Sequence, residues 1–118
     1  MDQMIAINKI YNEDCLDGMQ EIDDKSIDLI CTDLPYGQTA RNKWDSVIPF
    51  EPLWEQYERI IKDNGAIILF GNGMFTADLM QSNRKLWRYN IIWEKHSLVD
   101  TLMQIRCRSG NMKISVFL

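Results

Sequence analysis

Three short apolar runs, separated by segments with helical spacing, most constrain how this chain can fold. The runs cover residues 27–32, 66–70 and 89–93, and each has the length of a strand. Because they hold few polar residues, they are typical of strands that are covered on both faces. Strands that alternate with helices build layered α/β domains. The sequence therefore predicts an α/β fold with a mostly parallel sheet.

The segments around these runs carry helix and turn signals. Residues 5–11 mix β-branched and polar side chains like a further short strand, and Asp14 stands where a helix N-cap belongs. Pro52 is favoured in the first turn of a helix, and Asn64–Gly65 predicts a left-handed end of that helix. Residues 74–84 predict the next helix. The expected order is strand, helix, strand, long loop, helix, strand, helix, strand.

Composition indicates one globular domain. Of the 118 residues, 46% are hydrophobic and 25% are charged, which is ordinary for a globular protein. No apolar run approaches the roughly 18 residues that a membrane span needs, and the N-terminus lacks the features of a signal peptide. Three widely spaced cysteines and one histidine make neither a disulfide framework nor a metal site. We therefore expect a cytoplasmic protein that binds no metal and no membrane.

The charge is unevenly spread along the chain. Residues 1–83 carry 6 basic and 15 acidic side chains, whereas residues 84–118 carry 7 basic and 2 acidic ones, so sums of −9 and +5 make up the net charge of −4. A basic C-terminal segment can mark a surface that faces phosphates, although a solvated tail is the commoner explanation.

Two loops are candidates for a ligand site, because each leaves the carboxyl end of a predicted strand. Residues 33–37 follow the first apolar run and residues 71–73 follow the second. In open α/β sheets ligands bind beyond these strand ends, so we expect both loops on the same side of the domain. The loop that begins at Asp33 continues to about Pro49. Structureless loops longer than roughly 12–15 residues are usually functional or mobile.

The first of these loops carries the most informative motif. Asp33-Leu34-Pro35-Tyr36-Gly37 resembles the Asp-Pro-Pro-Tyr motif of the amino-methyltransferases that modify adenine N6 or cytosine N4 in DNA. The resemblance covers about residues 5–95. It implies a partial Rossmann-like methyltransferase fold, S-adenosylmethionine as cofactor, and double-stranded DNA with a flipped base as partner. Four neighbouring segments also match the family in order: residues 12–16, 25–29, 69–71 and 92–95.

The motif provides what methylation of an exocyclic amine requires. Such an amine on an aromatic base is a poor nucleophile, because its lone pair is delocalised into the ring. Two acceptors at its N–H groups stabilise the positive charge that grows as it attacks a methyl group. By the resemblance, Asp33 and the Leu34 carbonyl are these acceptors, Pro35 stiffens the turn, and Tyr36 stacks on the flipped base. In isolation, a turn capped by Asp33 beside a half-buried tyrosine explains such a motif more readily; the ordered neighbourhood favours catalysis.

Other residues near the motif carry weaker signals. By the resemblance, Asp14 and Cys15 border the cofactor cavity together with Asp33, although helix capping and plain burial explain the first two equally well. Gly71-Asn72-Gly73 lacks the third glycine of a dinucleotide-binding fingerprint and is interpreted as backbone freedom beside the site. The loop after Tyr36 offers candidates for contacts with the substrate, which are Gly37, Arg41, Lys43 and Trp44. A solvated loop anchored by one tryptophan explains these residues equally well.

The reaction class follows from the same motif. None of the three cysteines follows a proline, which argues against the thiolate chemistry of cytosine-C5 methyltransferases. Aspartate at the first motif position favours adenine N6 over cytosine N4, and the resemblance implies a bacterial or phage source. Methylation of RNA or of a protein side-chain amide is an alternative, because motifs of this shape also serve those substrates. A further alternative is a non-catalytic fragment that self-associates.

The subgroup that the chain resembles places a glycine-rich Phe-x-Gly-x-Gly segment, which holds S-adenosylmethionine, after the catalytic motif. Residues 70–73 follow the wrong strand for this segment and are one residue short. We predict that residues 1–95 are the catalytic half of a methyltransferase domain and that residues 96–118 are a divergent tail, replaced by a frameshift after about Lys95. Such a chain is expected to be weak or inactive and to form homo-oligomers through surface exposed by truncation.

Overall fold

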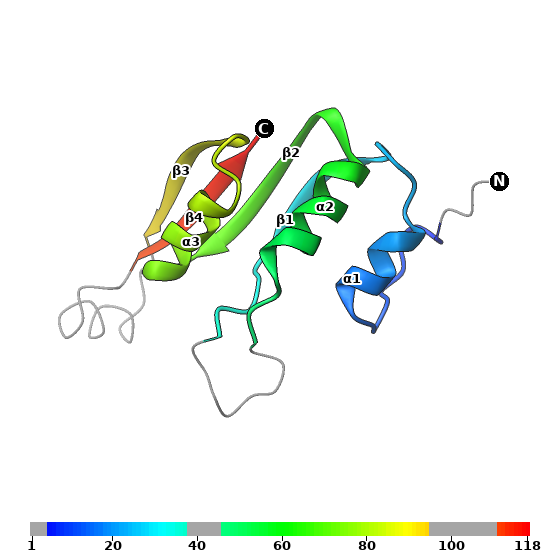
Figure 1. The fold of residues 1–118 in the computed structure, drawn as a ribbon, viewed down its shortest axis with the longest axis horizontal. Coiled ribbons are helices and arrows are strands. Elements are labelled where there is room, and N and C mark those ends of the chain that lie inside the picture. Colours follow the sequence, from blue (N-terminus) through cyan, green and yellow to red (C-terminus); the bar gives the residue numbers. More distant parts are fainter. Residues whose placement is uncertain (1–4, 38–45, 95–110) are drawn as a thin grey trace.

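The computed structural model describes residues 5–37, 46–94 and 111–118, which form one four-stranded sheet with helices packed against it (Figure 1). None of the helices in these ranges is long and apolar enough to cross a membrane. In chain order the elements are helix α1 (Cys15–Gly18), the 3-10 turn η1 (Met19–Glu21), strand β1 (Ile27–Thr32), helix α2 (Phe50–Ile60), strand β2 (Ile61–Gly71), helix α3 (Met74–Ser82), strand β3 (Trp87–Glu94) and strand β4 (Asn111–Phe117).

The sheet is mixed, so the prediction of a mostly parallel sheet is wrong, whereas the α/β class is confirmed. The strand order is β1-β2-β4-β3. Strands β1 and β2 are parallel, with Thr32 opposite Leu69, and β4 is antiparallel to both β2 and β3. The physical reason is that β4 lies between β2 and β3 and runs antiparallel to both, so a parallel β2–β3 pair does not form. Two of the three strand pairs are therefore antiparallel.

Strand β4 ties the C-terminal region to the rest of the sheet. Its residues belong to the stretch 96–118 that the sequence analysis sets apart as a tail, yet Ser115 and Phe117 have almost no exposed surface. The ring of Phe117 lies 4.7 Å, centroid to centroid, from the ring of Trp54 in α2. This strand is thus part of the common core, while the frameshift origin of residues 96–118 stays a hypothesis.

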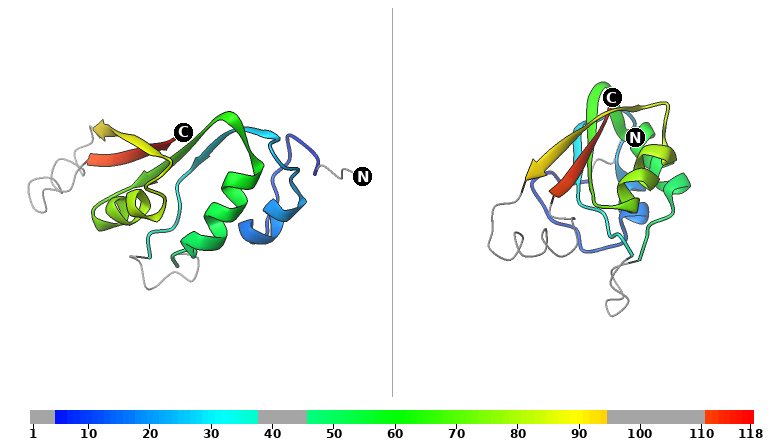
Figure 2. Two further views of the ribbon diagram at one scale, coloured as in Figure 1. Left: turned by 45° about the horizontal axis from the view of Figure 1, so that its top comes forward. Right: turned by 90° about the vertical axis from the view of Figure 1, so that its left-hand side faces the viewer.

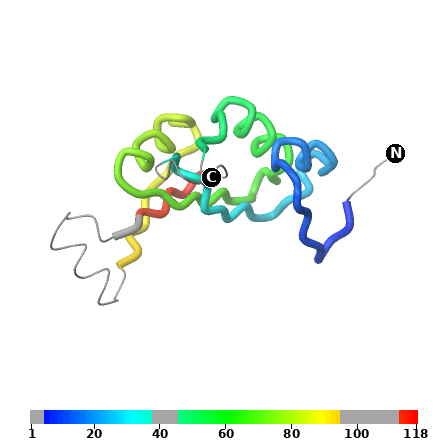
Figure 3. Tube along the Cα trace, turned by 90° about the horizontal axis from the view of Figure 1, so that it is seen from below, coloured from blue at the N-terminus to red at the C-terminus, as the bar shows by residue number. Residues whose placement is uncertain are grey.

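The helices lie on one face of the sheet, as the views in Figures 2 and 3 show. Helix α2 packs over the middle of the sheet and α3 over the β4 side, while α1 lies beyond β1 (Figure 1). Side chains from α2, α3 and the facing side of the strands form the core. Its fully or almost fully buried members include Leu53, Trp54, Tyr57, Ile67, Leu69, Phe75, Leu79 and Phe117.

The opposite face of the sheet carries apolar side chains that no helix of the described ranges covers. Leu29 on β1 is 54% exposed, and Ile91 on β3 is 46% exposed. Phe70 and Trp93 share this face, with ring centroids 6.2 Å apart. The expectation of strands covered on both faces is therefore wrong for the runs 27–32 and 89–93, whereas no residue of the run 66–70 is exposed. Apolar composition alone does not tell which other part of a protein covers a strand.

Local expectations were met where capping and helical spacing determine structure. Asp14 caps α1, because its carboxylate accepts a hydrogen bond from the Leu16 amide at 2.8 Å. Helix α2 starts at Phe50, two residues before Pro52, and α3 starts at Met74 as predicted. These signals act within one turn of helix, so distant parts of the chain do not override them.

Expectations that depended on distant partners were wrong in two places. Residues 5–11 form no strand, and Ile7 and Ile10 are 78% and 95% exposed, because no neighbouring strand pairs with them among the described residues. Asn64–Gly65 does not end a helix: α2 stops at Ile60, and the pair lies inside β2. They lie in the irregular part of the β1–β2 ladder, where the register jumps from Ile61 opposite Ile27 to Ala66 opposite Leu29.

Candidate functional site

The loops after β1 and β2 lie at the same edge of the sheet, as predicted. The two strands are parallel, so their carboxyl ends coincide. The loop after β1 reaches the start of α3, where the ring centroid of Tyr36 lies 4.8 Å from that of Phe75. The motif of residues 33–36 thus stands beside the segment that leaves β2.

Within the motif, Asp33 and Tyr36 are joined directly. The Tyr36 hydroxyl donates a hydrogen bond of 2.8 Å to Oδ1 of Asp33. Burial, and then the hydrogen bond and the negative charge of Asp33, raise the pKa of the Tyr36 hydroxyl above its usual range. The hydroxyl therefore stays protonated at neutral pH and acts as a donor. This bond orients a carboxylate that directly follows the end of β1.

Leu34 and Pro35 shape the turn between these two residues. The Leu34 side chain is only 5% exposed and belongs to the hydrophobic core. Its burial anchors the backbone of the motif, and Pro35 holds the preceding residue in an extended conformation. The Leu34 side chain is thus occupied in the core, which leaves its backbone carbonyl as the polar group that it can offer to a ligand.

An apolar cavity of about 490 Å³ runs along β1 and ends at the motif. Its walls come from α1, η1, β1, the motif and α2. Asp33 is the only carboxylate among the described residues that line it, and two cysteines, Cys15 and Cys31, also line it. A pocket of this size, mainly apolar with few polar groups, is typical of small-molecule sites. The remaining lining residues are Met19, Ile22, Ile27, Leu29, Ile30, Thr32, Leu34, Pro35, Ile48, Tyr57 and Ile60.

Of the two predicted cofactor residues in α1 and its cap, Cys15 lines the cavity and Asp14 does not. Cys15 lines the cavity, and burial, with a further effect of Asp14, raises the pKa of its thiol. The thiol is therefore not an activated nucleophile. Asp14 is not among the lining residues, and its carboxylate is bonded to the Leu16 amide as the cap of α1.

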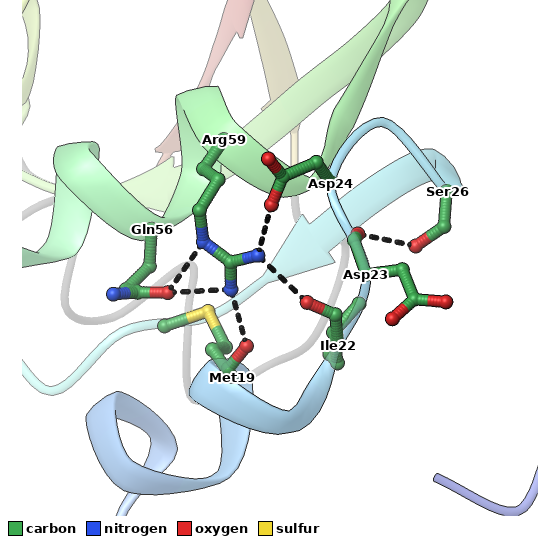
Figure 4. A network of polar contacts seen from close by, with 7 residues as sticks. All are labelled: Met19, Ile22, Asp23, Asp24, Ser26, Gln56 and Arg59. Carbon is green, nitrogen blue, oxygen red and sulfur yellow. Dashed lines mark hydrogen bonds and ion pairs between the residues drawn. The ribbon is translucent and has the colours of Figure 1, made fainter. Parts of the chain in front are cut away.

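Arg59 holds the α1–η1 wall of the cavity against α2 (Figure 4). Its guanidinium donates hydrogen bonds of 2.7 Å to the carbonyl oxygens of Met19 and Ile22 and to Oδ1 of Asp24. Gln56, one turn earlier in α2, accepts two further bonds and fixes the plane of the guanidinium. Sequence reasoning missed this residue, since its partners lie 35 to 40 positions away.

Of the other predicted substrate residues, the structure describes only Gly37. Gly37 follows Tyr36 with a φ of +73°, and a Cβ atom there would come within 2.8 Å of Val47 Cγ2, so the turn requires glycine. Neither Tyr36 nor Gly37 lines the cavity. The predicted residues Arg41, Lys43 and Trp44 lie outside the described residues.

Phe75 and Phe50 are further residues of the site that the sequence analysis did not assign to it. Phe75 is 4% exposed, and its ring lies between those of Tyr36 and Phe50, at centroid distances of 4.8 and 6.1 Å. The sequence analysis predicted a helix over residues 74–84, which includes Phe75, without a link to the motif. Its contact with the motif joins segments 39 positions apart, which no local pattern reveals.

Comparison with known proteins relates the chain to methyltransferases, although no protein-family model matches it. Type II methyltransferase M2.MboI of Moraxella bovis is 33% identical, over 73% of this chain and 40% of its own length. The similarity identifies type II methyltransferases as homologues. Type II methyltransferase M1.MboII of the same organism is 28% identical, over 78% of this chain and 39% of the relative, and M.HinfI of Haemophilus influenzae is 25% identical, over 75% and 32%. The chain thus spans at most 40% of these curated relatives.

Proposed function

We propose that this chain carries the catalytic segment of a DNA methyltransferase that transfers a methyl group from S-adenosylmethionine to adenine N6. The observation that supports this most is the hydrogen-bonded pair of Asp33 and Tyr36 at the end of β1, beside the apolar cavity. The similarity to type II methyltransferases supports the same reaction type.

The first role belongs to the two acceptors of the motif. Asp33 accepts a hydrogen bond from one N–H of the adenine amine, and the Leu34 carbonyl accepts one from the other. The nitrogen lone pair then moves out of conjugation with the ring, and the carboxylate stabilises the positive charge that develops on nitrogen. The buried Leu34 side chain supports this role, because it limits movement of the backbone carbonyl.

Tyr36 has two roles in the proposal. Its hydroxyl orients Asp33 through the 2.8 Å hydrogen bond, and its ring stacks on the base that has left the duplex. The raised pKa of Tyr36 is consistent with the first role, since the hydroxyl remains a donor over the whole neutral range. The direct contact with Phe75 is consistent with the second role, because it restrains the ring.

The cavity along β1 fits a cofactor with a flat apolar part and a positive centre. Its lining is mainly apolar, and Asp33, the one carboxylate among the described lining residues, stands at the end where the amine of the base is proposed to lie. S-adenosylmethionine supplies a methyl group on a sulfonium ion, so the N–C bond forms as the C–S bond breaks with its electron pair remaining on sulfur. Asp33 or water then accepts the proton that the amine loses. Cys15 borders the cofactor without reacting, because its thiol stays protonated.

The activity of these 118 residues alone is proposed to be low, because they span at most 40% of the relatives' length. They also contain no match to the glycine-rich segment of the subgroup that the chain resembles. We also propose self-association through the uncovered face of the sheet. The exposed side chains of Leu29, Tyr89 and Ile91 support this, since exposed apolar surface favours association in water.

A methyl-transfer assay with identification of the product base tests the proposed function. The chain at high concentration is incubated with S-adenosylmethionine and unmethylated double-stranded DNA, and the nucleosides are separated by mass spectrometry. We expect N6-methyladenine from the wild type and none from Asp33→Ala. Asp28→Ala is the matched control, because it removes a carboxylate of β1 that pairs with Lys62 away from the motif. Product that forms equally in Asp33→Ala, or no product at all, would contradict the proposal.

A further inference from the structure

Phe75 stands at the meeting point of three segments of the candidate site. It lies in the first turn of α3, two residues after Gly73, whose φ of +58° turns the chain from β2 into the helix. Its side chain is 4% exposed. Its ring contacts that of Tyr36 from the loop after β1 and lies near that of Phe50 at the start of α2. A single buried ring thus connects the motif to both helices of the site.

Tyr36 is restrained at two points, and Phe75 is one of them. The hydroxyl end is held by Asp33 at 2.8 Å. The ring itself packs against Phe75, with 4.8 Å between centroids and an angle of 34° between the ring planes. A hydrogen bond at the tip alone leaves the ring free to turn about its own long axis. The packing against Phe75 removes that freedom and defines the ring plane.

Phe75 is itself fixed, so it can act as a template for its neighbour. The backbone around it is held by the hydrogen bond from the Thr76 amide to the Gly73 carbonyl, at 3.1 Å. Phe50 packs near its ring at 6.1 Å between centroids. Side chains buried in this way occupy one rotamer. The helix and the core therefore set the orientation of the Phe75 ring, and the Tyr36 ring takes the orientation that packs against it.

We propose that Phe75 is a positioning residue that sets the plane of the Tyr36 ring on which the flipped base stacks. It does not touch the substrate, and the inference rests on the proposed function for the role of Tyr36. Without the aromatic ring at position 75, Tyr36 still bonds to Asp33 but samples several ring planes. Binding of the base then has to fix the Tyr36 ring in one orientation, and the entropy lost in doing so weakens binding.

Fluorine NMR of the chain labelled with 3-fluorotyrosine tests the positioning role without any nucleic acid. The Tyr36 signal is assigned by its loss in Tyr36→Phe. In Phe75→Leu we expect this signal to move toward that of an exposed tyrosine and its titration to shift to lower pH. Phe117→Leu is the matched control, because Phe117 is 1% exposed and packs against Trp54 rather than Tyr36. Circular dichroism and urea unfolding establish that both variants fold.

Titration with single-stranded oligodeoxyadenylate, observed through the same signal, tests the consequence for base stacking. Stacking of a base on an aromatic side chain contributes enough that Phe75→Leu should weaken binding about tenfold, with Phe117→Leu close to wild type. A Tyr36 signal that Phe75→Leu leaves unmoved, or that Phe117→Leu moves equally, would overturn the positioning role. A wild-type signal that the oligonucleotide does not move would contradict the proposed function instead, because the first experiment needs no substrate.

Discussion

Replacing Arg59 by methionine should loosen the wall of the candidate cofactor cavity. The guanidinium donates to the carbonyl oxygens of Met19 and Ile22, to Asp24 and to Gln56 (Figure 4). Methionine keeps most of the aliphatic length but none of the donors. The two carbonyl oxygens then lose their cationic partner, and the segment between α1 and β1 is no longer tied to α2.

The expected size follows from how exposed the partners are. The ion pair with Asp24 contributes little, at about 0–1 kcal/mol, because the Asp24 side chain is 75% exposed. The two bonds to carbonyl oxygens are part-buried, and the Arg59 side chain is 28% exposed. Hydrogen bonds to a charged group contribute about 1.5–3 kcal/mol each, and water that reaches the freed carbonyls reduces the loss. We expect Arg59→Met to lower the free energy of unfolding by about 2–4 kcal/mol.

Urea unfolding followed by circular dichroism measures this loss. Asp24→Ala and Lys62→Met are the matched controls, because each removes one exposed ion pair and no bond to a carbonyl. Both should lose no more than about 1 kcal/mol. Hydrogen exchange in Arg59→Met should also rise first between α1 and β1. A loss in Arg59→Met no larger than in Asp24→Ala would refute the reasoning, since the carbonyl bonds would then contribute nothing.

Two further predictions concern pH and association. Burial raises the pKa of Tyr57 to about 12; the neutral hydroxyl is favoured in the folded state, so its stabilisation is complete below the ordinary value near 10 and is lost as pH rises toward 12. Thermal unfolding between pH 9 and 11.5 should show a steeper fall in stability for wild type than for Tyr57→Phe; equal slopes would argue against this. Self-association through the uncovered sheet face predicts that Ile91→Lys, at a side chain 46% exposed, lowers the sedimentation coefficient at high protein concentration. The same coefficient in wild type and variant would exclude that face as the contact.

Much of the fold could be predicted because its signals are local. The apolar run 27–32 forms β1, and the helix predicted around Pro52 forms as α2, with Leu53, Trp54 and Tyr57 on its buried face. Asp14 capped α1 as expected. Each of these depends on residues within one or two turns or one strand. Tertiary contacts therefore did not override the secondary structure that these local signals predict.

The parts that failed depend on which strands become neighbours. The position of β4 between β2 and β3 could not be deduced, because strand pairing joins residues far apart in sequence. The run Ile114-Ser115-Val116-Phe117 did carry a strand signal, which the interpretation of residues 96–118 as a divergent tail set aside. Conversely, residues 5–11 had strand composition without a partner. Composition identifies a strand candidate, but pairing decides whether it forms.

For the candidate site, the sequence located the motif but not its surroundings. Asp33 and Tyr36 were predicted as one site, and their hydrogen bond brings them together. Phe75 packs against Tyr36, and Arg59 holds the α1–η1 wall of the cavity, through contacts that cross 35 to 40 positions. Such supporting contacts depend on tertiary packing. Their residues look like ordinary core or surface positions until the fold is known.

Isothermal titration of the chain with S-adenosylmethionine tests the central claim most directly, which is that Asp33 and the cavity along β1 form one cofactor site. The account predicts saturable binding to the wild type, clearly weaker binding to Asp33→Ala, and unchanged binding to Asp28→Ala. Absence of saturable binding, or equal affinity in wild type and Asp33→Ala, would contradict it.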